Sequence, residues 1–152
     1  MAESENNNLF YTFFILDASA IIHFQAVLPE HPNIRYVISH SVFEELTTRL
    51  TQYRFQVLEE KHLITYLEPS SEALNEALTA AGKVGSLQSL SQADIDVIAL
   101  AIDLKSSTKK RLIVVTNDFS IQNVCSFLNI PFQPTENAFK IKDEIEWTWI
   151  CR

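Results

Sequence analysis

A continuous apolar and aromatic run near the N-terminus constrains the fold of this chain more than any other feature. Residues 10–16 read FYTFFIL and lack the alternation of apolar and polar residues that marks a strand with one wet face. Such a run is typical of a strand buried on both faces, as in a parallel sheet. The segment SAIIHFQAVL, which follows Asp17, reads as a helix. The start of the chain therefore predicts the first strand and helix of an α/β protein.

The same alternation of strand and helix continues along the chain. Further strands are predicted at 36–38, 63–67, 112–115 and 130–132, and helices at 41–60, 70–82, 91–105 and 118–128. Ser39 or Ser41 can cap the helix at 41–60, and Ser41 has capping-box spacing with Glu44. We expect a loop at 83–90 and a hairpin or edge strand at 138–150. Alternating strands and helices imply a parallel sheet with right-handed crossovers.

The composition fits one globular domain and excludes several classes of protein. The chain has 152 residues, of which 47% are hydrophobic, and no apolar run approaches the roughly 18 residues of a membrane span. Its two glycines, Gly82 and Gly85, exclude a Gly-rich phosphate-binding loop. Its two cysteines are too few for a disulfide framework, so we expect reduced thiols, a buried Cys125 and a cytoplasmic protein. Residues 1–8 are polar, lack the pattern of a signal peptide and are expected to form a disordered tail.

The net charge of −7 is unusual for a protein that binds nucleic acid, because phosphates are contacted by Lys and Arg. The one basic cluster is KSSTKKR at 105–111. It is a candidate phosphate contact, and a solvated loop before a strand explains it at least as well. A bound metal ion would neutralise part of the negative charge.

Four acidic residues stand where a parallel sheet would gather them. Asp17 and Asp118 each follow a predicted strand, and Glu45 and Asp94 lie in the first turns of predicted helices. Ligands of open parallel sheets bind outside the carboxyl ends of the strands. Carboxylates that converge there repel one another unless a cation lies among them. Mg²⁺ prefers such oxygen ligands, and two ions about 4 Å apart can activate a water and stabilise the leaving oxygen of a phosphodiester.

Each acid also has a purely structural interpretation. Asp17 and Asp118 suit helix N-caps, Asp94 has capping-box spacing from Ser91, and Glu45 could be a solvated helix residue. A structural role explains each acid singly, but it does not explain why all four are placed near one predicted edge of the sheet.

Other polar residues stand close to these four acids in the sequence. Asp96 lies two residues after Asp94 on one helix and cannot face the same way, so we expect Asp96 to be solvated or a local cap. Glu44 and Glu45 are adjacent, and the pattern does not decide which of them points inward. The hydroxyls of Ser19 and Thr116 are placed to orient the carboxylates.

Two further features have weaker functional interpretations. His40 lies near the end of the second strand and is a minor candidate for a place in the site. Trp147 and Trp149 share one side of a terminal strand and suit a core or partner surface better than an RNA-stacking platform.

Four segments resemble the acidic motifs of the PIN-domain nucleases. They are ILDASAII, SHSVFEEL, LSQADIDVIALAI and VVTNDFSIQNV. The resemblance favours Glu45 over Glu44 and Asp94 over Asp96, and it matches Thr116 and Asp118 to the hydroxyl and acid of the last motif. LSxxDIxVIALA and TNDFSIQNV are similar to the Nob-type PIN endonucleases, which trim the 3′ end of small-subunit ribosomal RNA.

The resemblance implies a three-layer α/β fold over 9–150, with a five-stranded parallel sheet and helices on both faces. It implies hydrolysis of single-stranded RNA, with small-subunit pre-ribosomal RNA or its particle as partner. One or two Mg²⁺ or Mn²⁺ ions would be held by four acids, Asp17, Glu45, Asp94 and Asp118. Supporting roles fall to Ser19, Thr116 and Asn123, and Gln122 is site-adjacent.

The sequence departs from the Nob-type pattern in two places, and these departures limit the roles that the resemblance implies. Asn117 stands where a second Asp is frequent, which weakens any role there but leaves Asp118. A zinc ribbon follows the PIN domain in that family, whereas this sequence stops at TWICR, so 151–152 resembles the stub of such a ribbon. A lone Cys151 cannot form a four-ligand zinc site, and no zinc is expected. A missing ribbon or a protein partner would then supply basic RNA contacts.

Two other functions remain open at this level. A VapC-like toxin ribonuclease would keep the chemistry, although the long loop before Ser91 and the FSIQNV segment argue against it. A non-catalytic ribosome-assembly module would keep the fold, although four intact acids argue against it.

Overall fold

A five-stranded parallel sheet forms the centre of the computed structural model, which describes residues 11–23, 31, 33–46, 48–107 and 111–135. The strands lie in the order β3-β2-β1-β4-β5, and every neighbouring pair is parallel. They are β1 (Thr12–Leu16), β2 (Ile34–Ile38), β3 (Ile64–Tyr66), β4 (Arg111–Val115) and β5 (Phe132–Gln133). The predicted α/β class and parallel sheet are confirmed, and β5 begins two residues later than predicted.

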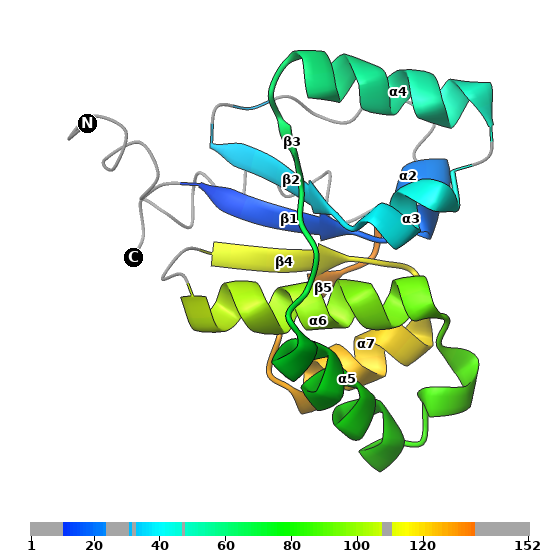
Figure 1. Ribbon diagram of the computed structural model, residues 1–152, viewed down its shortest axis with the longest axis vertical. Coiled ribbons are helices and arrows are strands. Elements are labelled where there is room, and N and C mark those ends of the chain that lie inside the picture. The colour runs from blue at the N-terminus through cyan, green and yellow to red at the C-terminus, as the bar shows by residue number, and fades with distance from the viewer. Residues whose placement is uncertain (1–10, 24–30, 32, 47, 108–110, 136–152) are drawn as a thin grey trace.

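Helices cover both faces of this sheet and complete a three-layer architecture (Figure 1). They are α2 (Ala18–His23), α3 (His40–Glu44), α4 (Arg49–Glu60), α5 (Ser71–Lys83), α6 (Gln92–Ser107) and α7 (Phe119–Phe127). Helix α6 packs on β1 and β4 and contacts α3, α5 and α7, whereas α4 packs beside β3. The stretch predicted as a loop at 83–90 contains a short 3₁₀ helix, η1 (Leu87–Ser89).

The centre of the core lies between β1 and α6. In β1, Phe14, Ile15 and Leu16 are almost completely buried, as expected for a strand covered on both faces. In α6, the seven consecutive residues 95–101 are buried, because the helix is enclosed by the sheet and by neighbouring helices rather than by one partner. This burial fixes the start of α6 relative to the ends of the central strands.

The single helix predicted at 41–60 is wrong, because two helices, α3 and α4, occupy this stretch. The side chain of Thr48 accepts a hydrogen bond of 3.2 Å from the backbone N–H of Thr51 and caps a new helix start. Such local side-chain bonds compete with continuation of the preceding helix. Ser39, not Ser41, caps α3 by accepting from the N–H of Val42, so the predicted capping box of Ser41 and Glu44 does not form.

The carboxyl ends of the strands and the amino ends of several helices meet at one edge of the sheet. Figure 1 shows the arrows of β1, β2 and β4 pointing toward the end at which α2, α3 and α6 begin. This edge carries residues that follow the strands directly, Asp17, Ser39 and Thr116. We call it the acidic rim.

Several sequence-based expectations concern residues outside the described ranges. They are the tail at 1–8, the strand or hairpin at 138–150 with its two tryptophans, and Cys151. Among the helices that the structure describes, none combines the length and apolar character needed to cross a lipid bilayer.

Candidate functional site

Asp17 is the most enclosed acid of the rim, with only 4% of its surface exposed. Its Oδ2 accepts a hydrogen bond of 2.5 Å from Oγ1 of Thr116. Its Oδ1 accepts two bonds of 2.8 Å, from Oγ of Ser19 and from the backbone N–H of Ala20. Burial raises the pKa of Asp17, these donors partly offset that effect, and the charge of Asp94 raises the pKa further. Asp17 is thus both the N-terminal cap of α2 and a fixed, electrostatically destabilised carboxylate.

Thr116 links the ends of the two central strands. While its hydroxyl donates to Asp17, it accepts a hydrogen bond of 3.0 Å from the backbone N–H of Asp118. Asp118 caps α7, because its Oδ1 accepts a 2.8 Å bond from the N–H of Ser120. One hydroxyl therefore sets the spacing between two of the four candidate acids.

Asp94 both caps α6 and lies within the electrostatic influence of other acids of the rim. Its N–H donates to Oγ of Ser91 at 3.2 Å, and its Oδ2 accepts from the N–H of Ser91 at 2.9 Å, which completes a capping box. Burial raises the pKa of Asp94, the bonds to Ser91 lower it, and the charge of Asp118 raises it. The capping box holds the side chain within electrostatic range of Asp17, Glu45 and Asp118.

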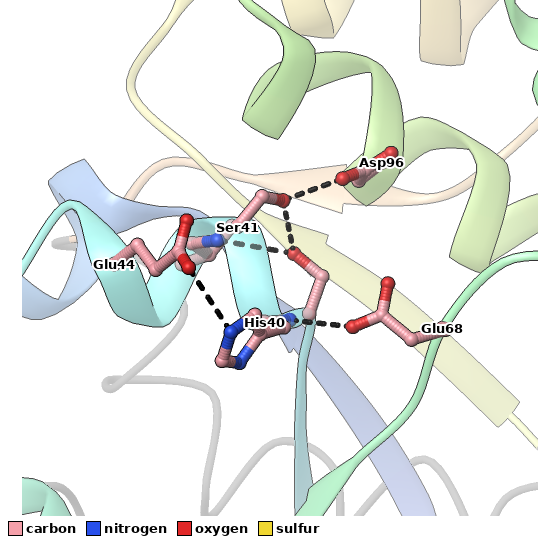
Figure 2. Close-up of polar contacts among 7 residues, drawn as sticks. His40, Ser41, Glu44, Glu68 and Asp96 are labelled. Atoms are coloured by element: carbon pink, nitrogen blue, oxygen red, sulfur yellow. Dashed lines mark hydrogen bonds and ion pairs between the residues drawn. The ribbon is translucent and has the colours of Figure 1, made fainter.

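Glu45 follows α3 as its C-cap and does not lie in a first helical turn as expected. Partial burial raises its pKa, and the charges of Asp94 and Asp17 raise it further. The adjacent Glu44 points elsewhere, since its Oε1 lies 3.0 Å from Nε2 of His40 on the exposed surface (Figure 2). Glu45, and not Glu44, therefore shares the electrostatic environment of the rim.

The four candidate acids come from four separate segments, and their charges act on the pKa values of Asp17, Glu45 and Asp94. Asp94 is coupled to Asp17, Glu45 and Asp118, and Glu45 is also coupled to Asp17. Each coupling raises a pKa, as expected for like charges at one edge. However, no three Asp, Glu, His or Cys side chains in the described ranges are arranged to ligate one ion. The rim is therefore looser than a closed cage of protein ligands. Its donors suit Mg²⁺, which retains several waters and binds proteins through one or two carboxylates.

The residues expected to support the acids differ in their placement. Ser19 and Thr116 both donate to Asp17, as their sequence positions predicted. Asn123 is exposed on α7 and has no hydrogen bond to any of the four acids. Gln122 makes the closer contact, since its Nε2 donates to the carbonyl of Thr116 at 2.9 Å. The sequence already indicated this contact, because Gln122 stands four residues after Asp118 and therefore lies on the same side of α7.

Asn117 points away from the acids toward the chain beyond β5. Its Oδ1 accepts a hydrogen bond of 2.8 Å from the backbone N–H of Thr135. An amide at this position therefore connects the β4 end to the β5 end, a role that does not require a charge.

Asp96 is not solvated as expected, because only 7% of its surface is exposed. Its Oδ2 accepts a 2.5 Å hydrogen bond from Oγ of Ser41, and its Oδ1 accepts from Nε2 of Gln92 at 3.0 Å. The Ser41 hydroxyl also shares a 2.9 Å bond with Oγ of Ser39 (Figure 2). The expectation failed because α3 packs across the start of α6 and covers this carboxylate. Asp96 thereby ties the helix that precedes Glu45 to the helix that carries Asp94.

Other expected candidates lie away from the acidic rim or play structural roles. The backbone N–H of His40 donates to Oε1 of Glu68 at 2.9 Å, and its side chain faces Glu44 (Figure 2). Lys105 of the basic cluster donates to the carbonyls of Leu128 and Asn129, at 3.1 and 2.9 Å, and so stabilises the end of α7.

Cys125 lies in the core, as predicted from its apolar surroundings. It is a free cysteine on the buried side of α7. Burial raises the pKa of its thiol to about 12, so it is a packing residue rather than a nucleophile.

Sequence and structure comparisons relate this chain to known proteins. The model of the family described as "PIN domain of ribonuclease" matches residues 14–104. The chain is 33% identical over 110 residues to endoribonuclease Nob1 of Pyrococcus abyssi, a match that covers 72% of this chain and 63% of that protein. It is 34% identical over 138 residues to ribonuclease VapC1 of Thermoplasma acidophilum, covering 91% of this chain and 65% of that protein. The chain thus spans less than two thirds of the length of each of these relatives.

A solved structure shares the fold. A chain of VapBC-1 from nontypeable Haemophilus influenzae superposes with a TM-score of 0.55 at 15% identity, covering 82% of this chain and 98% of that one. The family match covers more than half of this sequence and includes Asp17, Glu45 and Asp94. The chain belongs to the PIN-domain ribonuclease family.

Proposed function

We propose that the protein is a metal-dependent endoribonuclease that hydrolyses phosphodiester bonds in single-stranded RNA. The observation that carries the proposal is the placement of Asp17, Glu45, Asp94 and Asp118, from four separate segments, at the carboxyl edge of the sheet, where the charge of Asp94 raises the pKa values of Asp17 and Glu45 and the charge of Asp118 raises that of Asp94. A fold gains no stability from gathering like charges, so such a cluster is explained by a cation that binds there. The family membership supports a nuclease as the enzyme class.

One or two Mg²⁺ or Mn²⁺ ions are the proposed cofactors, held by the four acids in part through water. When bound, such ions supply an activated water and stabilise the charge that develops on the phosphodiester. The chain's own residues fix the orientation of the donors. Thr116 and Ser19 hold Asp17, Ser91 holds Asp94, and Ser120 holds Asp118. Carboxylates fixed in this way do not have to reorganise when the substrate arrives.

Small-subunit pre-ribosomal RNA is the proposed substrate, cleaved at its 3′ end during ribosome biogenesis in the cytoplasm. The proposal is supported by the similarity to endoribonucleases named Nob1 and by the segments LSQADIDVIALAI and TNDFSIQNV. The chain covers 63% of the length of the Pyrococcus relative, and we propose that it shares the activity of that longer protein.

A VapC-like toxin ribonuclease is the second candidate. It is favoured by the 34% identity to VapC1 over 91% of this chain and by the VapBC-1 fold similarity. It would use the same acids on a different RNA and would act with a protein partner. A non-catalytic ribosome-assembly module is a third possibility, and it would show neither cleavage nor Mn²⁺ binding.

The adjacent glutamates provide a matched test of the proposal. We expect the wild-type chain to cleave a short single-stranded RNA spanning a small-subunit rRNA 3′ end when Mn²⁺ is present. Glu45→Gln should lose most of this activity, and Glu44→Gln, one residue away with its side chain beside His40, should keep it. Asp94→Asn serves as the inactive reference.

The same assay separates the three candidates. Cleavage of other RNAs in preference to the rRNA 3′ end would favour the toxin. Absence of cleavage by the wild type, with no Mn²⁺ binding at millimolar concentration, would exclude a metal-dependent nuclease. Equal activity of the two glutamine variants would exclude Glu45 from the site.

A further inference from the structure

The most exposed large apolar side chain in the described part of the protein borders the acidic rim. Phe119 has 79% of its surface exposed, more than any other large hydrophobic residue there. It is the first residue of α7 and follows Asp118 directly. An aromatic ring left almost entirely in water contributes little to packing in the core. Its position beside a candidate catalytic acid therefore suggests a binding role.

The backbone on both sides of Phe119 is fixed by hydrogen bonds. Asp118 is bonded through its N–H to Thr116, at 3.0 Å, and through its Oδ1 to the N–H of Ser120, at 2.8 Å. The hydroxyl of Ser120 also shares a 2.8 Å bond with the hydroxyl of Ser89, at the end of η1. The backbone that carries the exposed ring is therefore held in place. The Cα atom of Phe119 lies one peptide unit, about 3.8 Å, from the Cα atom of Asp118.

The charge of the protein makes an uncharged contact with RNA useful at this edge. The chain carries a net charge of −7, and the part of RNA binding that comes from neutralising phosphates depends on Lys and Arg. Arg111 begins β4, at the opposite end of a strand that spans about 15 Å. Lys105 is bonded to carbonyls at the far end of α7. Stacking of a base on an aromatic ring needs neither cation and tolerates any base.

We infer that Phe119 is a base-stacking platform, which binds an unstacked base of single-stranded RNA beside the phosphodiester that faces Asp118. This inference rests on the proposed nuclease function and specifies how its substrate is held. Unpaired bases are free to stack on aromatic side chains, whereas bases within a duplex are already stacked on their neighbours. The platform therefore gives the site a preference for single strands that does not depend on sequence.

RNA affinity measured by fluorescence anisotropy tests the inference. The full chain carries Asp94→Asn so that the labelled probe, a short single-stranded RNA of mixed sequence, stays intact. Phe119→Ala should weaken binding by about 5- to 150-fold, the usual range for one stacked base. Phe119→Trp should bind at least as tightly as the parent. Because stacking is uncharged, the loss in Phe119→Ala should be the same at low and at high KCl, and a duplex of the same sequence should compete poorly.

Phe127 provides a matched control on the same helix. It is 48% exposed and ends α7, away from the rim, so Phe127→Ala should change the affinity by less than about twofold. Thermal melting should show all the variants folded at the assay temperature, because neither ring belongs to the buried core. The inference is overturned if Phe119→Ala binds as the parent does, or if Phe119→Leu keeps full affinity, because an apolar contact without stacking would then suffice.

Cleavage assays with Asp94 restored separate this inference from the proposed function. If the wild type does not cut RNA in Mn²⁺, the nuclease proposal fails, whatever the binding data show. If the wild type cuts RNA and Phe119→Ala has the same kcat/KM as Phe127→Ala, only the role of Phe119 fails.

Discussion

Ser41 on α3 and Asp96 on α6 are joined by a hydrogen bond of 2.5 Å that spans 55 residues of sequence. Asp96 is buried, so the serine hydroxyl satisfies a carboxylate that is largely shielded from water. The contact also fixes α3 against α6. Glu45 is the C-cap of α3, and the first turn of α6 holds Asp94. A bond outside the acidic rim therefore helps to set the separation of two of its acids.

Removal of this bond should affect both stability and activity. Ser41→Ala leaves the buried Asp96 with one donor fewer, and we expect the free energy of unfolding to fall by about 1–3 kcal/mol. Cleavage should fall about 10- to 100-fold if α3 shifts Glu45, which is the usual effect of losing a contact that orients a ligand. Urea unfolding and single-turnover kinetics measure the two effects.

Ser126→Ala, at an exposed position on α7, is the control for this prediction and should resemble the wild type. A Ser41→Ala protein that loses stability but cleaves at the wild-type rate would show that Glu45 does not depend on the α3–α6 contact.

Thr116 tests how far one hydroxyl organises the rim. Thr116→Val has nearly the same shape but removes the donor to Asp17 and the acceptor for the N–H of Asp118. The pKa of the buried Asp17 should rise further because a hydrogen bond that lowers it is lost. We expect Mn²⁺ affinity, measured by calorimetry, to fall about 10- to 100-fold. Thr116→Ser keeps the hydroxyl and should restore most of the affinity, and equal affinities for the two variants would exclude this orienting role.

Stability in the absence of divalent ions should fall as the pH rises. Burial and neighbouring charges raise the pKa values of Asp17, Glu45 and Asp94 in the folded protein. The folded state therefore holds these protons more tightly than the unfolded chain, whose acids titrate near pH 4. The stabilising effect of the protons is complete below that pH and is lost as the pH rises through the folded pKa values.

Mn²⁺ should reverse this loss, because it binds the deprotonated acids of the folded state. Thermal melting near pH 7 should therefore show a higher Tm with Mn²⁺ than with EDTA, and melting near pH 4 should show little difference. Asp94→Asn keeps an acceptor for the N–H of Ser91 but removes a charge, so its Tm should respond less to Mn²⁺. A Tm that is the same with Mn²⁺ and EDTA near pH 7 would contradict the prediction.

The sequence alone determined the order in which strands and helices follow one another along the chain, and the positions of the acids relative to them. Both follow from local patterns, because a strand buried on both faces must be apolar throughout and a cap must stand directly before its helix. The run at 10–16 predicted β1, and Asp17 and Asp118 were expected at strand ends for the same reason. The family resemblance of the acidic segments was likewise visible in the sequence.

Only the tertiary structure decided which side chains face one another. The residue pattern did not decide between Glu44 and Glu45, although the family resemblance favoured Glu45. The directions of these two side chains, the burial of Asp96 and the direction of His40 depend on how α3 packs against α6. The interruption between α3 and α4 was missed for a different reason, because it rests on a local bond between Thr48 and Thr51 that competes with helix propensity. Burial and electrostatic coupling join residues far apart in the chain, so no pattern within a short segment can specify them.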